Sequence, residues 1–283
     1  MMQKLFIVLQ YLIPQHLLSR AAGWLANTEI PWIKNPFIEF FIRQYSVNMS
    51  EAADPEARNY PNFNAFFTRA LRDDARTVAE DTKAIASPAD GSISQLGRIE
   101  NGRIFQAKGQ SYTVQELLGG DNALAEQFID GCFSTIYLSP KDYHRVHMPV
   151  SGTLQQMIYV PGDLFSVNKA TAENVPRLFA RNERLVAIFE TAAGPMAMVL
   201  VGAMIVAAIE TVWAGQVTPT PKTVNTTRYN EAVTIALNKG EEMGRFKLGS
   251  TVVLLFPKDR VKWDEALAAG SPLMMGQEIA QLI

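Results

Sequence analysis

From residue 84 onward, closely spaced glycine and proline turns divide the chain into short apolar segments. Three of these segments, at 133–138, 185–189 and 251–256, are rich in β-branched and aromatic residues. Turn signals that separate such segments stand at 87–91, 139–140, 150–152, 161–163, 193–195 and 214–215. Frequent short strands between such turns are typical of a β-sandwich or barrel. Two short helices are expected within this region, at 113–118 and 122–129.

The first 50 residues have a different pattern, in which apolar and aromatic residues are interrupted by single cations. No stretch here reaches the roughly 20 apolar residues that a spanning helix needs, and no cleavage site of a signal peptide is evident. Apolar helices with aromatic and cationic edges suit a membrane interface, and packing on the core is the alternative. We therefore expect an α+β fold. Residues 1–50 should form amphipathic membrane-interface helices, and residues 51–283 a β-rich domain with a barrel or sandwich core.

Between these regions, the spacing of Phe63, Phe66, Phe67, Ala70 and Leu71 predicts one helix over 62–71. Asn62 is the expected N-cap. Residues 72–76 have the polar composition of a solvated exit from this helix.

Residues 191–209 carry no charge, but a turn opens this stretch. The apolar run that follows, 196–209, is shorter than a membrane span. Gly202 is expected to divide it into two core strands.

Composition excludes several classes of protein. A net charge of −2 over 283 residues gives no basic footprint for nucleic acid. The single cysteine, Cys132, excludes an internal disulfide and a multi-cysteine metal site. Only three histidines are present, and His144 and His147 stand three residues apart. These two are the main candidates for acid–base chemistry near neutral pH.

Three local motifs could carry chemistry, although each also has an ordinary structural explanation. Asp90 lies on a Pro-Ala-Asp-Gly turn at 88–91, and such turns are usually structural. The histidines at 144 and 147 could bind metal only with further ligands, and no companion cluster is evident, so no metal is expected. Gly249 and Ser250 precede a strand-like run, where a turn is the ordinary interpretation.

Taken together, the three motifs allow a mechanism. A serine hydroxyl is a poor nucleophile until a base removes its proton, and a carboxylate often orients a histidine that acts as this base. Asp90, His147 and Ser250 follow one another in the chain order of a known triad. Gly249 leaves the carbonyl before Ser250 without side-chain bulk. The bond between residues 249 and 250 is therefore open to Ser250 Oγ.

The motifs together resemble one family, the pyruvoyl-dependent phosphatidylserine decarboxylases of bacteria, in their prokaryotic type I form. The matching segments cover nearly the whole chain, and they are 88–91, 143–147, 159–168, 179–184, 210–215 and 248–251. Any one of these tetra- to decapeptides is a weak signal, whereas all of them in order are specific.

The resemblance implies a proenzyme that cleaves itself. His147, oriented by Asp90, would deprotonate Ser250, which would attack the Gly249 carbonyl to form an ester. β-Elimination would then give a β chain, 1–249, and an α chain, 250–283, whose first residue becomes a covalent pyruvoyl group. This cofactor would form a Schiff base with the amine of phosphatidylserine and serve as the electron sink for loss of CO₂. Phosphatidylethanolamine would be the product.

The same resemblance assigns further roles. His144 is expected to assist decarboxylation or to hold the head group, and Ser166 and Asn168 to contact the phosphate. The partners implied are phosphatidylserine in the bilayer, an anionic membrane surface, and a heterodimer of the two chains that could pair into a homodimer. The expected location is the cytoplasmic face of the inner membrane, as a peripheral protein, with no nucleic acid bound.

Three alternatives remain open from the sequence. A Ser-His-Asp hydrolase could act on other substrates and would stay a single chain. A membrane-associated scaffold without activity could keep the same fold. A soluble pyruvoyl enzyme could act on a free amino acid, although the apolar N-terminal region argues against it.

Overall fold

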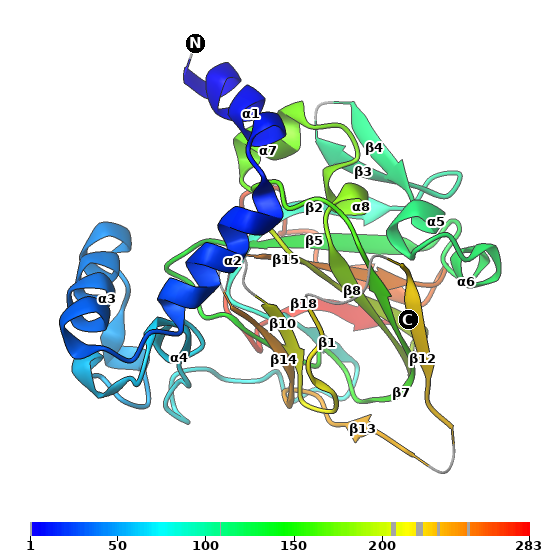
Figure 1. Cartoon of the computed structure of the whole chain (residues 1–283). Helices are drawn as coiled ribbons and strands as arrows, with labels where there is room; N and C mark the ends of the chain where they lie inside the picture. The colour runs from blue at the N-terminus through cyan, green and yellow to red at the C-terminus, as the bar shows by residue number, and fades with distance from the viewer. Residues whose placement is uncertain (1, 108, 205–207, 219–222, 231–232, 248–249) are drawn as a thin grey trace.

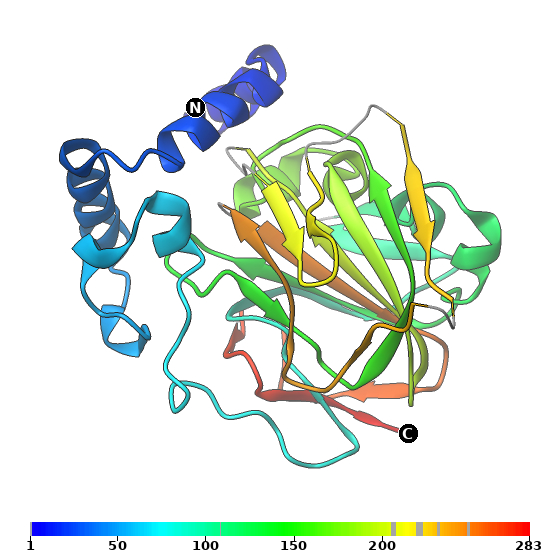
Figure 2. The same cartoon turned by 60° about the horizontal axis from the view of Figure 1, so that its bottom comes forward.

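The computed structural model describes residues 2–107, 109–204, 208–218, 223–230, 233–247 and 250–283. The first helices lie along and beside a body built from antiparallel sheets, and α3 stands apart from that body next to α4 (Figure 1 and Figure 2). This arrangement confirms the expected α+β fold, with N-terminal helices followed by a β-rich core.

The largest sheet has nine strands in the order β12-β7-β8-β9-β15-β5-β2-β17, with β13 also paired to β7. Strand β15 lies between β9 and β5 and is antiparallel to both. The three segments expected as strands are confirmed as β5, β8 and β15. The strands of this sheet are β2 (Gly91–Arg98), β5 (Cys132–Leu138), β7 (Gly152–Val160), β8 (Arg184–Thr191), β9 (Gly194–Val201), β12 (Asn225–Arg228), β13 (Ala236–Leu237), β15 (Ser250–Phe256) and β17 (Pro272–Leu273).

Both faces of the central strand β15 are buried, which explains why residues 252–256 are all apolar. Successive side chains of a strand point to opposite faces. Val252 and Leu254 accordingly belong to one hydrophobic core, whereas Val253 and Leu255 belong to another. A strand that is covered on both sides has no position for a polar side chain that faces water. Ser250 and Thr251 therefore also lie in a dry environment.

Two smaller sheets cover one face of the large sheet and contribute to the first core. One is ordered β1-β18-β16 and the other β11-β10-β14-β6. Their strands are β1 (Ala84–Ala86), β6 (Arg145–His147), β10 (Ala208–Thr211), β11 (Gly215–Gln216), β14 (Glu242–Lys247), β16 (Val261–Trp263) and β18 (Glu278–Leu282). The two expected catalytic motifs, at 88–91 and 143–147, therefore border this side of the molecule.

A hairpin and four short helices cover the opposite face and complete the second core. These elements are β3 (Arg103–Ala107), β4 (Gln110–Thr113), α5 (Val114–Leu117), α6 (Asn122–Glu126), α7 (Lys169–Asn174) and α8 (Leu178–Arg181). The helices α5 and α6 confirm the two that were expected here. Side chains of Thr113 and Asp121 cap them by accepting backbone N–H groups of the first turn.

The N-terminal region consists of α1 (Met2–Leu12), α2 (Gln15–Ala26) and α3 (Pro31–Tyr45), followed by η1 (Met49–Glu51), η2 (Ala57–Asn59) and α4 (Phe63–Phe67). Aromatic residues of α3 and α4 form a third, separate core. None of the described helices combines the length and the apolarity needed to cross a bilayer.

Two local expectations were wrong. Asn62 caps α4 as expected, but the helix ends at Phe67 and does not reach 71. It ends because Leu71 is drawn into an extended bridge with Ala52, and the next residue, Arg72, donates its N–H to Glu51 O. The second error concerns Arg76, which was expected in solvent but has a side chain only 8% exposed. Gly202 lies between β9 and β10, as expected.

Candidate active site

Ser250 is the first residue of β15, where it pairs with Leu138 at the end of β5. Its side chain is fully buried, and its Oγ has no hydrogen-bond partner within the described part of the chain. A serine that serves only structure in a core normally satisfies its hydroxyl. Gly249, the other half of the expected cleavage site, lies outside the described residues.

His144 lies just before β6, and its ring is completely buried. Nδ1 lies 2.8 Å from the carbonyl oxygen of Asp142, so this nitrogen carries the proton. Nε2 is then a bare base, and no described residue contacts it through a hydrogen bond. Burial lowers the pKa of His144 to about 3, which keeps the ring neutral at physiological pH. The ring of Phe67 packs against it at a centroid distance of 4.0 Å.

His147 ends β6 and is less deeply buried. Its Nδ1 lies 2.8 Å from Gly240 O and therefore donates, which leaves Nε2 as the basic nitrogen. Nε2 lies 3.0 Å from the hydroxyl of Tyr143. Burial raises the pKa of Tyr143 to about 12, so the hydroxyl is protonated and donates to the ring. Burial also lowers the pKa of His147.

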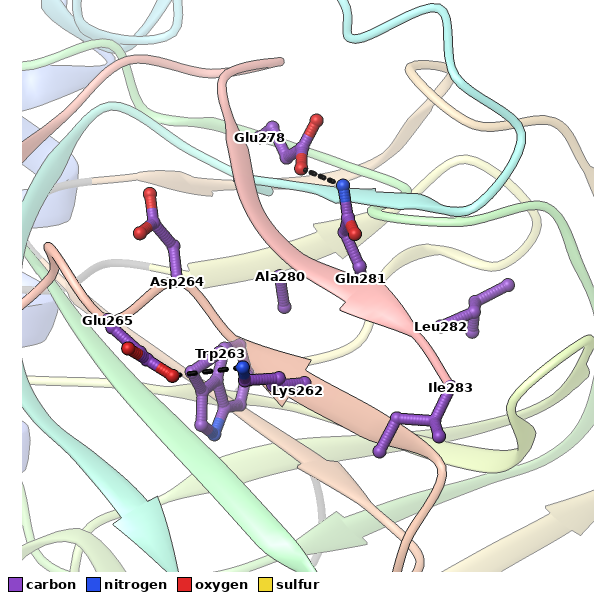
Figure 3. A pocket seen from close by; sticks show the side chains of 9 residues that line it. All are labelled: Lys262, Trp263, Asp264, Glu265, Glu278, Ala280, Gln281, Leu282 and Ile283. Carbon is purple, nitrogen blue, oxygen red and sulfur yellow. Dashed lines mark hydrogen bonds and ion pairs between the residues drawn. The ribbon is translucent and has the colours of Figure 1, made fainter.

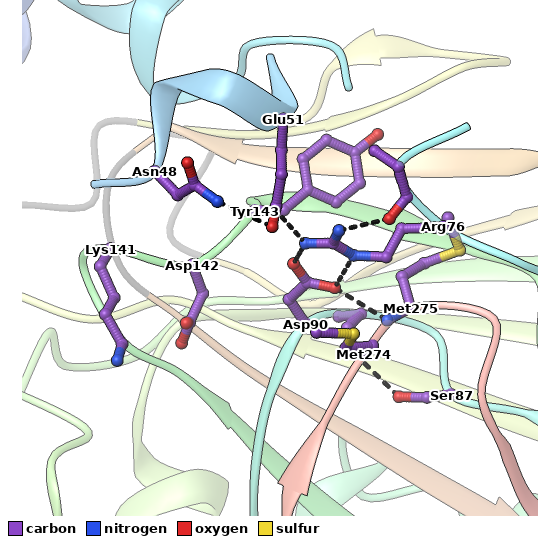
Figure 4. A network of polar contacts seen from close by, with 12 residues as sticks. Asn48, Glu51, Arg76, Ser87, Asp90, Lys141, Asp142, Tyr143, Met274 and Met275 are labelled. Carbon is purple, nitrogen blue, oxygen red and sulfur yellow. Dashed lines mark hydrogen bonds and ion pairs between the residues drawn. The ribbon is translucent and has the colours of Figure 1, made fainter. Parts of the chain in front are cut away.

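Asp90 is held by two donors from other parts of the chain (Figure 4). The Arg76 guanidinium donates to both carboxylate oxygens, with Nε 2.9 Å from Oδ1, and Met275 N–H donates to Oδ1 at 2.8 Å. Arg76 Nη2 also lies 2.7 Å from a carboxylate oxygen of Glu51. The turn needs glycine after Asp90, because a Cβ on Gly91 would stand 2.3 Å from Tyr137 O.

The structure brings the motifs of Asp90 and His147 side by side, but it does not join their side chains. The backbone N–H of His147 donates to Pro88 O at 2.8 Å, which fixes the turn of Asp90 against β6. Both ring nitrogens of His147 are engaged elsewhere, by Gly240 O and by the Tyr143 hydroxyl. The negative charge of Asp90 still acts on His147 through space and counteracts part of the fall in its pKa.

Ser250 and His144 border a common segment. Ser250 pairs with Leu138, immediately before residues 139–143, and His144 follows directly after them. The strand that leads towards Ser250 contacts the same region, because Phe246 N donates to His144 O at 3.0 Å. Ser250 Oγ and His144 Nε2 are two of the buried polar atoms that have no hydrogen-bond partner among the described residues, and neighbouring pieces of backbone carry them.

Ser166 and Asn168 lie beside α1. Gln10 of α1 accepts the Ser166 N–H at 2.8 Å, and Asn168 Oδ1 caps α7 by accepting from Thr171 N at 2.9 Å. The contacts that the structure gives these two residues are thus structural.

Three functional candidates were missed by the sequence analysis, namely Tyr143, Arg76 and Arg69, which lies just after α4, is 4% exposed and contributes its charge to the low pKa of His144. Tyr143 lay within a recognised motif, and its position four residues before His147 was the available signal. The two arginines stand in a stretch of mixed charges, and nothing in that stretch distinguishes a buried arginine from a solvated one.

A separate surface pocket of about 640 Å³ lies on the small sheet of β16 and β18 (Figure 3). Its wall consists of C-terminal residues, among them Lys262, Trp263 and Gln281, and it contains none of the candidate residues. Among the residues that the structure describes, no group of histidine, cysteine, aspartate and glutamate side chains could hold a metal ion.

Comparison with known proteins identifies the family of the chain. A family model described as phosphatidylserine decarboxylase matches residues 63–281, and a second, described as PSD, matches residues 5–46. A protein of Pseudomonas fluorescens named phosphatidylserine decarboxylase proenzyme is 63% identical over 98% of this chain and 97% of its own length. Proteins with the same name from Stutzerimonas stutzeri and Azotobacter vinelandii are each 60% identical over 99% of this chain and cover 95% and 99% of their own lengths. The chain therefore belongs to the phosphatidylserine decarboxylase family.

Proposed function

We propose that the chain is a proenzyme that cuts its own Gly249–Ser250 bond and then converts phosphatidylserine to phosphatidylethanolamine and CO₂. One observation supports this most directly. The Ser250 hydroxyl is fully buried at the start of a central strand, without a described hydrogen-bond partner. A buried hydroxyl in that state loses its hydrogen bonds to water and gains none in return, which costs stability. A chemical role explains why such a group is kept.

Self-cleavage requires a base and an acyl shift. His147 is suited to be the base, because Gly240 O holds the proton on Nδ1 and leaves Nε2 basic. For the reaction, Nε2 would exchange its contact with Tyr143 for the Ser250 hydroxyl. Ser250 Oγ then bonds to the Gly249 carbonyl carbon while the C–N bond breaks, which gives an ester and a free amine at residue 250.

The ester is resolved by elimination. Removal of the Ser250 Cα proton expels the Gly249 carboxylate and leaves dehydroalanine at the new N-terminus. Water then adds to the imine tautomer of this residue and ammonia leaves, so residue 250 ends as a pyruvoyl group. The role of Asp90 in these steps is electrostatic, since its charge favours the protonated form of His147.

The position of Ser250 fits such a group, because the residue is enclosed and its side-chain oxygen has no hydrogen bond to any described residue. The pyruvoyl carbonyl would supply the electron sink for loss of CO₂. His144 would lie close to the reacting atoms as a neutral ring with a bare Nε2, able to accept or return a proton there. Ser166 and Asn168 remain proposed contacts for the lipid phosphate.

The substrate stays in a bilayer, so the protein has to bind the membrane surface. Most of the large hydrophobic side chains that the described structure exposes belong to α1, α2 and α3, for example Leu12 at 74% exposure, Trp24 at 73% and Trp32 at 76%. Helices of this kind suit the interface between head groups and acyl chains. We infer peripheral attachment through these helices to the cytoplasmic face of the inner membrane.

Intact-mass measurement of the purified protein tests the cleavage. We expect two chains, 1–249 and 250–283, with the smaller one carrying a pyruvoyl mass and a blocked N-terminus. Ser250→Ala should give one uncut chain, whereas Ser134→Ala, on the paired strand β5, should cleave as the unchanged protein does. A single full-length species from a protein that releases CO₂ from phosphatidylserine would contradict the proposal, and a single chain that hydrolyses other substrates would favour the hydrolase alternative.

A further inference from the structure

Arg69 is a buried cation whose side chain lacks the partners that such a group normally has. It lies just after α4 and is 4% exposed. Its Nη2 donates one long hydrogen bond, 3.3 Å, to Lys141 O. Its Nε has no partner, and no ion pair joins it to a carboxylate, as far as the described residues extend.

The other buried arginines of the chain show what is missing. Arg184 is 2% exposed, and its guanidinium donates to four backbone carbonyl oxygens. Arg76 binds the carboxylates of Asp90 and Glu51. A buried charge is costly unless it is paired or fully hydrogen-bonded, and burial lowers the pKa of Arg69. Among the residues that the structure describes, this guanidinium therefore has no partner for most of its donors.

The position of this guanidinium relates it to the reacting residues. Lys141, whose carbonyl it contacts, belongs to the segment 139–143 that separates the partner of Ser250 from His144. Two neighbouring aromatic residues of α4 also connect the guanidinium with His144. Arg69 lies over the Phe66 ring, and Phe67 packs on the His144 ring. The positive charge of Arg69 contributes to the low pKa of His144. Lys141 is itself exposed, so the guanidinium lies directly beneath the surface.

We propose that Arg69 binds the phosphodiester of the lipid substrate. The assignment rests on the proposed function, because it takes phosphatidylserine as the ligand. A guanidinium offers paired N–H donors that match two phosphate oxygens, and Arg69 Nε has no hydrogen-bond partner in the described part of the chain.

The substrate carries a second anion, the carboxylate that leaves as CO₂, and the chemistry argues against it as the ligand. A cation on that carboxylate would stabilise the ground state more than a transition state in which its charge is being lost, and this would slow the reaction. The phosphodiester keeps its charge throughout. Binding it lowers the energies of the ground state and the transition state equally, so it improves KM without opposing decarboxylation.

Steady-state kinetics on phosphatidylserine in mixed micelles test the proposal with Arg69→Gln, Arg69→Lys and Arg72→Gln. Arg72 is the matched control, because it lies three residues away with an exposed side chain. We expect Arg69→Gln to raise KM roughly 10- to 100-fold, the loss expected for hydrogen bonds to a charged group, with kcat changed only a few-fold. Arg69→Lys keeps the charge and should give a smaller increase, and Arg72→Gln should leave KM unchanged.

Inhibition by glycerophosphoethanolamine, which has the phosphodiester but no carboxylate, identifies the group that is bound. Its inhibition constant should rise in Arg69→Gln by the same factor as KM. A raised KM with unchanged inhibition would mean that Arg69 binds the carboxylate, and equal inhibition by inorganic phosphate would indicate a site for free phosphate; either result would overturn the proposal.

Cleavage of each variant is followed on a denaturing gel, so that kinetics are compared between equally processed enzymes. If Arg69→Gln fails to fold or cleave, Arg69→Lys decides, and a normal KM in that variant overturns the proposal. If the unchanged protein neither cleaves nor releases CO₂, the proposed function itself fails. An active unchanged protein with a normal KM in Arg69→Gln rejects only the role of Arg69.

Discussion

The position of the Asp90 carboxylate depends on Arg76, a residue that lies outside the sequence motifs of the site. The two side chains are 10% and 8% exposed and share two hydrogen bonds. Arg76→Gln would leave the buried carboxylate with Met275 N–H as its remaining described donor. Removal of one partner of a buried pair typically costs about 3–5 kcal/mol. We expect this variant of the proenzyme to lose stability on that scale in urea unfolding and to cleave itself more slowly on a timed denaturing gel.

Arg98→Gln is the control for this experiment, because its ion pair with Asp259 is 3.9 Å long and both side chains are largely exposed. Surface pairs of this kind contribute about 0–1 kcal/mol. Self-cleavage of Arg76→Gln at the normal rate would show that Arg76 does not position Asp90 for the reaction.

His144 should make stability depend on pH in a defined direction. Its pKa is about 3 in the folded chain because of burial, against about 6.5 when unfolded. Between these values the unfolded chain takes up a proton that the folded chain refuses. The titration of His144 therefore leaves the free energy of unfolding unchanged well above pH 6.5. It lowers this free energy as the pH drops below 6.5, by at most about 1.4 kcal/mol per pH unit.

Urea unfolding of the uncut Ser250→Ala protein at pH 7 and pH 5 measures this effect. The loss on acidification should be smaller when His144→Asn is added, since asparagine can still donate to Asp142 O but does not titrate. Burial lowers the pKa of His147 as well. Some loss of stability on acidification should therefore remain in the His144→Asn variant. Equal losses with and without His144 would contradict the prediction.

At the scale of elements, α1 has an inverted pattern for a helix in water. It buries the polar side chain of Gln10, which is 1% exposed, and exposes Leu5, Val8 and Leu12. Gln10 and Gln15 use their side chains to accept the backbone N–H groups of Ser166 and Leu164. A helix that turns polar residues inward and apolar residues outward has the pattern expected at a lipid interface, in line with the proposed membrane attachment.

Vesicle sedimentation of a Leu12→Ser, Trp24→Ser, Trp32→Ser triple variant tests this interpretation. Because each of these side chains would add about 1.5–3 kcal/mol on full burial, we expect vesicle binding to fall by more than 10-fold while self-cleavage continues. Phe105→Ser is the matched control, since Phe105 is an exposed aromatic residue on β3, far from these helices in sequence. Substitution is a cleaner test than deletion, because α1 and α2 also cover the backbone of residues 162–166. Full sedimentation of the triple variant would exclude the helices as the anchor.

The elements that could be predicted from the sequence are those whose pattern is local. Strand β15 was predictable because five consecutive apolar residues follow a turn signal, and α5 and α6 were predicted as short helices at 113–118 and 122–129. Helix α4 was predicted too long, because the bridge between Leu71 and Ala52 is a tertiary contact that overrides the helical spacing. The contacts of Asp90 with Arg76 and Met275 also join distant segments, so no local pattern revealed them.

At the scale of the whole molecule, cleavage at Ser250 would cut the chain beside a strand that both products need. β15 pairs with β5 over its full length and with β9 over residues 251–255. The rest of the C-terminal chain is equally interwoven, since β17 pairs with β2 and β18 with β1. The described pairings of β15 with β5 and β9 do not require the peptide bond between residues 249 and 250.

We therefore expect the two chains to remain one complex after cleavage. Residues 252–256 are all buried and apolar, and at about 1.5–3 kcal/mol for each full burial they alone would contribute on the order of 10 kcal/mol to holding the strand. Native mass spectrometry should find both chains in one species, which elutes like uncut Ser250→Ala in size-exclusion chromatography, while a denaturing gel separates them. Dissociation should require the urea concentrations that unfold the sheet, because release of β15 opens both cores at once. Elution of the 250–283 chain by itself under native conditions would mean that the pairing of β15 is weaker than its burial implies.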